Sequence, residues 1–195
     1  MALTPDGTFY TLTGPADAPV VALIHGLGLN NACWQWLAPV LETRFRVLRY
    51  DLIGHGQSAD PKGKATLKML SDQLAHVLDH TGITNAAVIG FSLGGMIARR
   101  FAQDYPARTQ ALVILHSPHR RSDAAQAAIL ARVEQARAEG PAATVEAALD
   151  RWFTPAFRAA NPAMMQLVRS WVLANDPAIY PALYLVFAEG IFDVI

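Results

Sequence analysis

The sequence predicts an α/β protein with a mostly parallel sheet, helices on both of its faces and a later helical insert. Short apolar runs rich in β-branched residues alternate with segments of helical periodicity. Three of these runs stop at glycine-containing turns, and no strand-like run follows residue 120. Such alternation is typical of parallel sheets that are covered by helices on both sides.

Five segments are predicted to be strands, because each is too short for a buried helix and is rich in aliphatic, aromatic or β-branched residues. They are residues 8–13, 18–24, 45–52, 86–91 and 110–115. Two helical patterns separate the last three strands, one around residues 67–78 and one that begins at Gly94 and ends before Pro106. Ligands of such sheets bind at the carboxyl ends of the strands, where we expect the site.

The insert is predicted to consist of successive amphipathic helices with their own start and stop signals. These signals are Gly140-Pro141, Thr154-Pro155, Asn161-Pro162, Asp176-Pro177 and Gly190. We therefore predict a core over residues 1–119 and a helical cap over residues 120–190. Residues 191–195 are interpreted as the start of a C-terminal core segment that this sequence lacks.

The composition of the 195 residues, 52% hydrophobic and 16% charged, predicts a soluble globular protein. Lys plus Arg and Asp plus Glu both number 16, and no long run of one sign is available to bind nucleic acid or an anionic membrane. No apolar stretch reaches the roughly 18 residues of a membrane span, and no leader pattern opens the chain. We expect a cytoplasmic protein with a small-molecule partner.

The single cysteine, Cys33, excludes an intrachain disulfide and has no neighbours at metal-ligand spacing. We interpret it as a packing residue. The sequence therefore predicts no metal site.

Gly90-Phe91-Ser92-Leu93-Gly94 matches the GxSxG pattern of a nucleophile elbow and lies between a predicted buried strand and a predicted helix. The glycines fit a strained turn at which side chains would collide with neighbouring backbone. Ser92 is the candidate nucleophile. The amide of Leu93, at the helix start, is a candidate oxyanion donor. The other interpretation is a glycine-rich turn whose serine caps the helix.

His25-Gly26-Leu27-Gly28, after the strand 18–24, is the candidate source of the second oxyanion donor. Small residues let this loop approach the nucleophile, and the amide of Leu27 is the expected donor. The alternative is a tight strand-to-helix turn. His25 is expected to be structural, since a catalytic base belongs on a different loop that faces the serine.

Three ordered segments together resemble the signatures of the α/β-hydrolases: HGLG at 25–28, DLIGHGQS at 51–58 and GFSLGG at 90–95. Within that superfamily the chain is most similar to the 3-oxoadipate enol-lactonase-like branch, whose members open lactone rings in aromatic degradation. The resemblance implies an α/β-hydrolase fold with a helical cap after the sixth strand, which agrees with the insert. It also implies that Asp51 and His55 hold the loop beneath the active site.

Three tryptophans are candidates for the substrate pocket: Trp34 after the oxyanion loop, and Trp152 and Trp171 in the insert. Trp36 is an equal candidate to Trp34. The alternative for Trp34 and Trp36 is packing of the following helix. For Trp152 and Trp171 the alternative is the helical core.

A complete triad is not found, because α/β-hydrolases order it as Ser, then Asp or Glu, then His. Only His116 and His119 follow Ser92, and both precede the insert. We therefore expect the acid and the histidine to be absent and the last strands to be lacking; His119 is the one alternative base that we consider. An apolar sheet edge without a partner strand favours self-association.

Two functional hypotheses remain. In the first, the chain is a hydrolase of carboxylic esters or lactones. Ser92 attacks the carbonyl, the amides of Leu27 and Leu93 hold the oxyanion, and a base comes from outside this sequence, with no cofactor. In the second, it is a non-catalytic α/β-hydrolase remnant that binds a small ligand or a partner chain. The serine at the elbow disfavours an aspartate-nucleophile dehalogenase.

Overall fold

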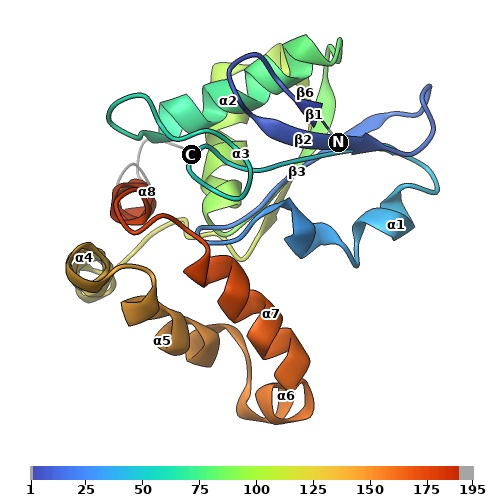
Figure 1. Cartoon of the computed structure of the whole chain (residues 1–195). Helices are drawn as coiled ribbons and strands as arrows, with labels where there is room; N and C mark the ends of the chain where they lie inside the picture. Colours follow the sequence, from blue (N-terminus) through green and yellow to red (C-terminus); the bar gives the residue numbers. More distant parts are fainter. Residues whose placement is uncertain (1, 189–195) are drawn as a thin grey trace.

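A computed structural model of the chain describes residues 2–188. Six strands form one sheet in the order β1-β2-β4-β3-β5-β6 (Figure 1). The strands are β1 (Ala2–Leu3), β2 (Phe9–Thr13), β3 (Val20–Ile24), β4 (Arg46–Tyr50), β5 (Ala86–Phe91) and β6 (Thr109–Leu115). β4, β3, β5 and β6 are parallel, while β1 and β2 add an antiparallel edge. The five predicted strands are confirmed; β1 is too short to carry a sequence signal.

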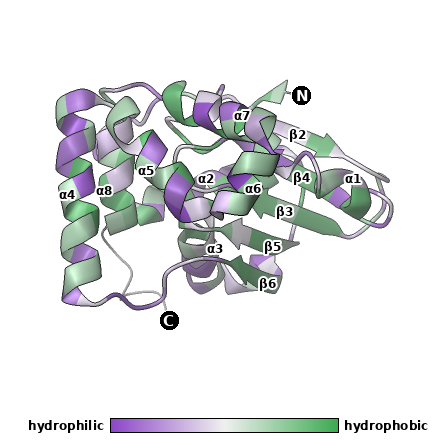
Figure 2. Ribbon diagram, turned by 90° about the horizontal axis from the view of Figure 1, so that it is seen from below, coloured by the Kyte–Doolittle hydropathy of each residue, from purple (hydrophilic) through white to green (hydrophobic). Residues whose placement is uncertain are grey.

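Side chains alternate between the two faces of a strand, and helices cover both faces at the centre of the sheet. Both faces are therefore buried there. On one face Ala22 and Ile24 of β3 pack under the helices α2 (Leu67–His80) and α3 (Leu93–Asp104). On the other face Val21 and Leu23 pack under the short helices η1 (Asn31–Trp34) and α1 (Ala38–Leu41). Figure 2 colours β3 and β5 green along most of their length, as fits strands without a solvent face.

β6 is the other edge of the sheet and pairs only with β5 among the described strands. It follows the short turn η2 (Pro106–Arg108). Leu112 and Val113, at the middle of β6, are 40% and 41% exposed. This end of the sheet therefore presents apolar side chains together with unpaired backbone groups.

The predicted insert is helical throughout its described part. It contains α4 (Asp123–Glu139), α5 (Ala142–Trp152), α6 (Pro155–Ala160), α7 (Pro162–Leu173) and α8 (Tyr180–Ala188). The sequence analysis missed α6, which Thr154 caps through a hydrogen bond from the amide of Phe157. No helix in residues 2–188 is long and apolar enough to cross a bilayer.

The last helix, α8, joins the insert to the core. Leu183 and Val186 are buried in the main core cluster with α2 and α3, whereas Tyr180 and Tyr184 pack against α4. Because α8 contributes residues to both hydrophobic clusters, the boundary between core and cap stays a prediction. Gly190 and residues 191–195 lie outside the described residues.

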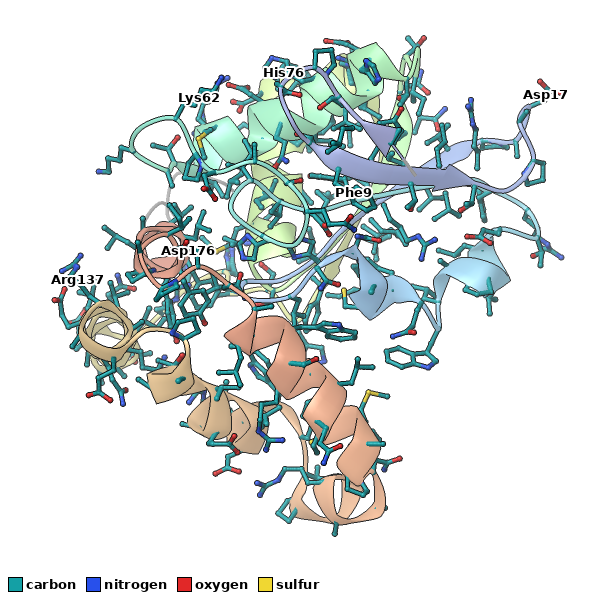
Figure 3. All side chains as sticks on the ribbon, in the orientation of Figure 1. Phe9, Asp17, Lys62, His76, Arg137 and Asp176 are labelled. Atoms are coloured by element: carbon teal, nitrogen blue, oxygen red, sulfur yellow. The ribbon has the colours of Figure 1, made fainter. Side chains whose placement is uncertain are left out.

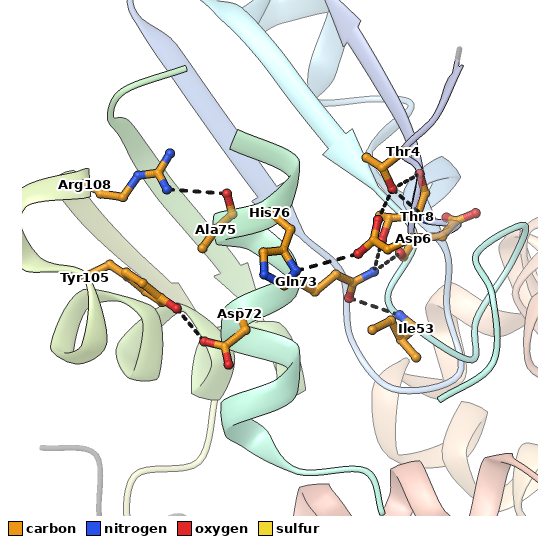
Figure 4. A network of polar contacts seen from close by, with 11 residues as sticks. Thr4, Asp6, Thr8, Ile53, Asp72, Gln73, Ala75, His76, Tyr105 and Arg108 are labelled. Carbon is orange, nitrogen blue, oxygen red and sulfur yellow. Dashed lines mark hydrogen bonds and ion pairs between the residues drawn. The ribbon is translucent and has the colours of Figure 1, made fainter. Parts of the chain in front are cut away.

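The loop after β4 is fastened to α2 by the buried amide of Gln73 (Figure 4). The Nε2 group of Gln73 donates to the hydroxyl of Thr8 at 3.1 Å and to the carbonyl of Asp51 at 3.0 Å. Its Oε1 atom accepts from the amide of Ile53 at 3.1 Å. One side chain on α2 thus connects the residue before β2 with the segment that carries the DLIGHGQS motif.

Candidate active site

Ser92 occupies a strained turn between β5 and α3. Its φ of 56° and ψ of −116° lie where side chains are disfavoured. Its amide donates to the carbonyl of Leu115 at the end of β6, at 2.9 Å, and its carbonyl accepts from the amide of Gly95 at 3.0 Å. The serine is therefore held at the carboxyl edge of the sheet by hydrogen bonds on both sides.

The glycines around Ser92 are required by close backbone packing. A Cβ atom on Gly90 would lie 2.1 Å from the carbonyl oxygen of Gly94. A Cβ atom on Gly94 would lie 2.2 Å from the carbonyl oxygen of Ile24, which belongs to the neighbouring strand. Both distances are far below van der Waals contact, so the elbow needs glycine at both positions to bring α3 against β3.

The HGLG loop lies directly against the elbow. A Cβ atom on Gly26 would be 3.2 Å from the Cβ atom of Ser92, and Leu27 and Ser92 line one cleft. Within the described part of the chain, neither the amide of Leu27 nor that of Leu93 donates to a backbone carbonyl. Both positions thus suit amides that would hold an oxyanion, and this role is part of the proposal below.

Two buried histidines connect the loops beneath the site through hydrogen bonds to the backbone. The Nε2 atom of His25 accepts from the amide of Leu52 at 2.9 Å, so its Nδ1 atom carries the hydrogen that faces the carbonyl of Gly26 at 2.8 Å. The Nε2 atom of His55 accepts from the amide of Gly28 at 3.0 Å. Burial lowers the pKa of His25 to about 4 and, helped by the neighbouring His25, that of His55 to about 3. Both rings are therefore neutral and engaged at neutral pH.

Asp51 organises the same loops from below. Its Oδ1 atom accepts from the amide and the side chain of Asn31, both at 2.7 Å, and its Oδ2 atom accepts from the amide of Gln57 at 2.9 Å. Through these hydrogen bonds the carboxylate of Asp51 connects the loop at Asn31 with the loop at Gln57.

A cleft of about 740 Å³ opens beside Ser92. Leu27 and the residues after β6 line it on the sheet side, and α4, α5 and α8 line it on the other. Of the two histidines that follow Ser92, His116 lines this cleft, whereas His119 does not. His116 has a φ of 47°, unusual outside glycine. The sequence analysis considered only His119; the signal it missed was that His116 is the first residue past the carboxyl end of β6.

The candidate pocket tryptophans take different places. Trp152 lines both this cleft and a second, apolar pocket of about 310 Å³. Trp171 and Trp36 line the second pocket. Trp34 is buried under the sheet with Val21 and Leu23 and lines neither space. We therefore leave Trp34 out of the proposed pocket, because its ring is buried among Val21, Leu23 and Ala38.

The helical insert is tied to the HGLG loop by Asn175, a residue without a signal in the sequence. Its buried Nδ2 group donates to the carbonyl of Gly28 at 3.0 Å and to that of Val172 at 2.9 Å. The end of α7 thereby fixes the loop that carries Leu27.

Neither metal ligands nor a reactive thiol mark this region. In the described part of the chain no three His, Cys, Asp or Glu side chains gather at metal-binding distance. Burial, together with the charge of Asp51, raises the pKa of the Cys33 thiol to about 12. Cys33 therefore stays protonated and inert at neutral pH.

Comparison with known proteins places this geometry in a family. Residues 19–154 match the family described as alpha/beta hydrolase fold. The 3-oxoadipate enol-lactonase 1 of Acinetobacter baylyi is 31% identical over 170 residues, which cover 86% of this chain and 61% of that protein. The magnesium-chelatase 30 kDa subunit of Rhodobacter capsulatus is 43% identical over 95 residues, or 48% of this chain and 34% of that protein.

Among solved structures, the enol-lactonase from Burkholderia xenovorans LB400 superposes with a TM-score of 0.88 at 28% identity, over 94% of this chain and 70% of that chain. The chain belongs to the α/β-hydrolase fold family and has enol-lactonase-like relatives. It spans less than two thirds of the length of the curated relatives named here.

Proposed function

We propose that the chain carries the nucleophile half of a serine hydrolase that acts on carboxylic esters or lactones. Ser92 attacks the carbonyl and the amides of Leu27 and Leu93 hold the tetrahedral oxyanion. The hydroxyl proton passes to a base outside the described residues, the alcohol leaves, and water later releases the acid. Two of the relatives named above are enol-lactonases, and these two support this reaction class.

The observation that carries the proposal is the strained serine at the N-terminus of α3 with the HGLG loop against it. Strain at a single non-glycine residue persists only where the surrounding structure enforces it, and such residues cluster at active sites. A serine that merely capped the helix would need no positive φ, and the Ser92 side chain makes no capping hydrogen bond to α3. The capping interpretation is therefore disfavoured.

A fluorophosphonate ester that reports on activated serines tests this proposal. We expect intact-mass spectrometry to show one phosphonyl group on the chain and none on Ser92→Ala. Ser117→Ala is the matched control, since Ser117 lines the same cleft but has an ordinary φ. Labelling that persists in Ser92→Ala would contradict the assignment of the nucleophile.

The second candidate function is the non-catalytic one, in which the chain binds a small ligand or a partner chain. One observation favours it: in residues 2–188 no histidine accepts a hydrogen bond from the hydroxyl of Ser92, and the two most buried rings serve loop backbone. A serine hydroxyl without a base is a weak nucleophile. Absence of labelling in the unchanged chain would favour this function.

We also propose that the chain associates with itself through β6. Its edge carries unpaired backbone groups, and Leu112 and Val113 are exposed beside them, which is the pattern of an association-prone strand.

A cytoplasmic location is proposed as well, on the ground that Cys33 is a free cysteine.

Replacing Val113 by lysine is expected to weaken self-association, because a charge on an edge strand opposes pairing with a second strand. Sedimentation velocity should show dimers or larger species for the unchanged chain at micromolar concentration, and mainly monomer for Val113→Lys. Val40→Lys is the control, since Val40 is 66% exposed on α1, away from this edge. A monomeric unchanged chain would contradict the proposal.

A further inference from the structure

Two spaces that differ in their lining share a wall at Trp152. The larger cleft is lined by arginines, tyrosines and small residues, and the smaller pocket almost wholly by apolar side chains. Trp152, at the end of α5, lines both of them. Phe91, the residue before the nucleophile, lines the smaller pocket, while Ser92 itself lines the larger one. A bound molecule that reaches Ser92 can therefore extend into both spaces.

The larger cleft carries two arginines with unused hydrogen-bonding capacity. Arg132, on α4, donates through Nε to the hydroxyl of Tyr184 at 3.0 Å, so its two terminal nitrogens face the cleft without a hydrogen-bond acceptor in residues 2–188. Arg151, on α5, makes neither a hydrogen bond nor an ion pair with any described residue. A third arginine, Arg121, is already engaged with the carbonyls at the end of α8.

Among residues 2–188, no carboxylate forms an ion pair with Arg132 or Arg151, although the charge of Asp150 acts on Arg151. Three acidic residues of α4 and α5 pair with other arginines: Asp150 with Arg158, Glu146 with Arg169, and Glu134 with Arg137. Partial burial, and then the charge of Arg132, lower the pKa of Arg151, and the same two causes lower that of Arg121. The guanidinium groups repel one another, a cost that a bound anion would relieve.

The smaller pocket has the size and lining of a site for an aromatic group. Its walls include three tryptophans, three phenylalanines and a methionine, with few polar atoms: Trp36, Trp152, Trp171, Phe91, Phe153, Phe157 and Met164. Its volume of about 310 Å³ exceeds the roughly 150 Å³ that suffices for a benzene ring in an apolar cavity. Aromatic walls favour a flat ring through edge and offset-stacked contacts.

We propose that this site takes an amphipathic ester, whose carboxylate is held by Arg132 and Arg151 and whose aryl or similarly bulky apolar group fills the pocket around Trp171. The inference rests on the proposed function only in placing the reacting carbonyl at Ser92, between the two spaces. Guanidinium groups bind carboxylates through paired, charge-assisted hydrogen bonds, which accounts for the need for two arginines.

Binding to the Ser92→Ala chain tests the proposal without requiring turnover. Isothermal titration compares three ligands: monobenzyl glutarate with both groups, monomethyl glutarate without the ring, and benzyl methyl glutarate without the charge. We expect monobenzyl glutarate to bind about tenfold more tightly than either of the others, since a charge-assisted pair and a buried ring each contribute at about that level.

Substitutions should remove the two advantages separately. Arg132→Gln and Arg151→Gln are expected to abolish the preference for the carboxylate and to keep the preference for the benzyl group, and Arg132→Lys should retain part of the former. Trp36→Leu and Phe157→Leu should abolish the preference for the benzyl group and keep the preference for the carboxylate. Trp36 is 53% exposed and Phe157 is 41% exposed, so neither change should prevent folding.

Arg137→Gln is the matched control. Arg137 lies on α4, as Arg132 does, but it is directed away from the molecule in Figure 3 and pairs with Glu134. It is expected to change neither preference. Equal affinity for charged and neutral ligands, or a carboxylate preference that survives both glutamine variants, would overturn the anion site. A benzyl preference that survives Trp36→Leu and Phe157→Leu would overturn the apolar site. Both preferences can hold while the fluorophosphonate test fails, so the two proposals fail independently.

Discussion

Hydrolysis of an activated aryl ester by the chain is expected to fall to the solvent background when Ser92 is replaced by alanine. Ser92 combines a strained backbone, a half-buried position in the lining of the cleft and two neighbouring amides suited to an oxyanion. In a complete serine triad, loss of the nucleophile lowers turnover by about 10⁶-fold. The measurement is the initial rate with p-nitrophenyl acetate, with and without the substitution.

The matched substitutions for this experiment are His119→Ala and His116→Ala. His119 does not line the cleft, so its removal should leave the rate unchanged. His116 lines it, and a loss in His116→Ala alone would mark that ring as the base. A rate above background that Ser92→Ala leaves unchanged would contradict the serine mechanism and favour the non-catalytic function.

The chain is expected to lose stability as the pH falls below about 6.5. His25 and His55 have folded-state pKa values of about 4 and about 3, below the ordinary value of 6.5. Between these values the unfolded chain binds more protons than the folded chain, so stability is fully present above pH 6.5 and decreases as the pH falls. Because the unfolded rings are half protonated at pH 6.5, each ring contributes about 1 kcal/mol between pH 6.5 and 5.5, or about 2 kcal/mol together.

Urea unfolding at pH 7, 6.5 and 5.5 measures this effect, in a range where carboxylates stay largely ionised. His80→Gln, which removes an exposed histidine on α2, should keep the same dependence. A free energy of unfolding that is constant from pH 7 to 5.5 would show that the two buried rings are protonated in the folded chain.

Local patterns in the sequence determined the sheet and the elbow. The runs at 18–24 and 86–91 are too short for buried helices and end at glycine, and they form β3 and β5. The GxSxG segment was placed correctly between a strand and a helix, because Gly90 and Gly94 permit contacts that other residues would block. The strand lengths and the contact between Gly90 and Gly94 depend on backbone sterics within a few residues, so they can be read without the fold.

Features that depend on distant partners could not be read in this way. Trp34 and Trp171 are alike in sequence, but Trp34 packs under the sheet while Trp171 lines a pocket. The direction of each ring follows from how η1 and α7 dock.

The same holds for the charge of the cleft. The net charge of zero conceals it, because Glu134, Glu146 and Asp150 pair with other arginines and no carboxylate in residues 2–188 forms an ion pair with Arg132 or Arg151. Asn175 meets the carbonyl of Gly28 across 147 positions of sequence. The sequence by itself therefore determined the fold class and the position of the GxSxG turn between β5 and α3, whereas only tertiary packing decided the cleft, its charge and the pocket beside it.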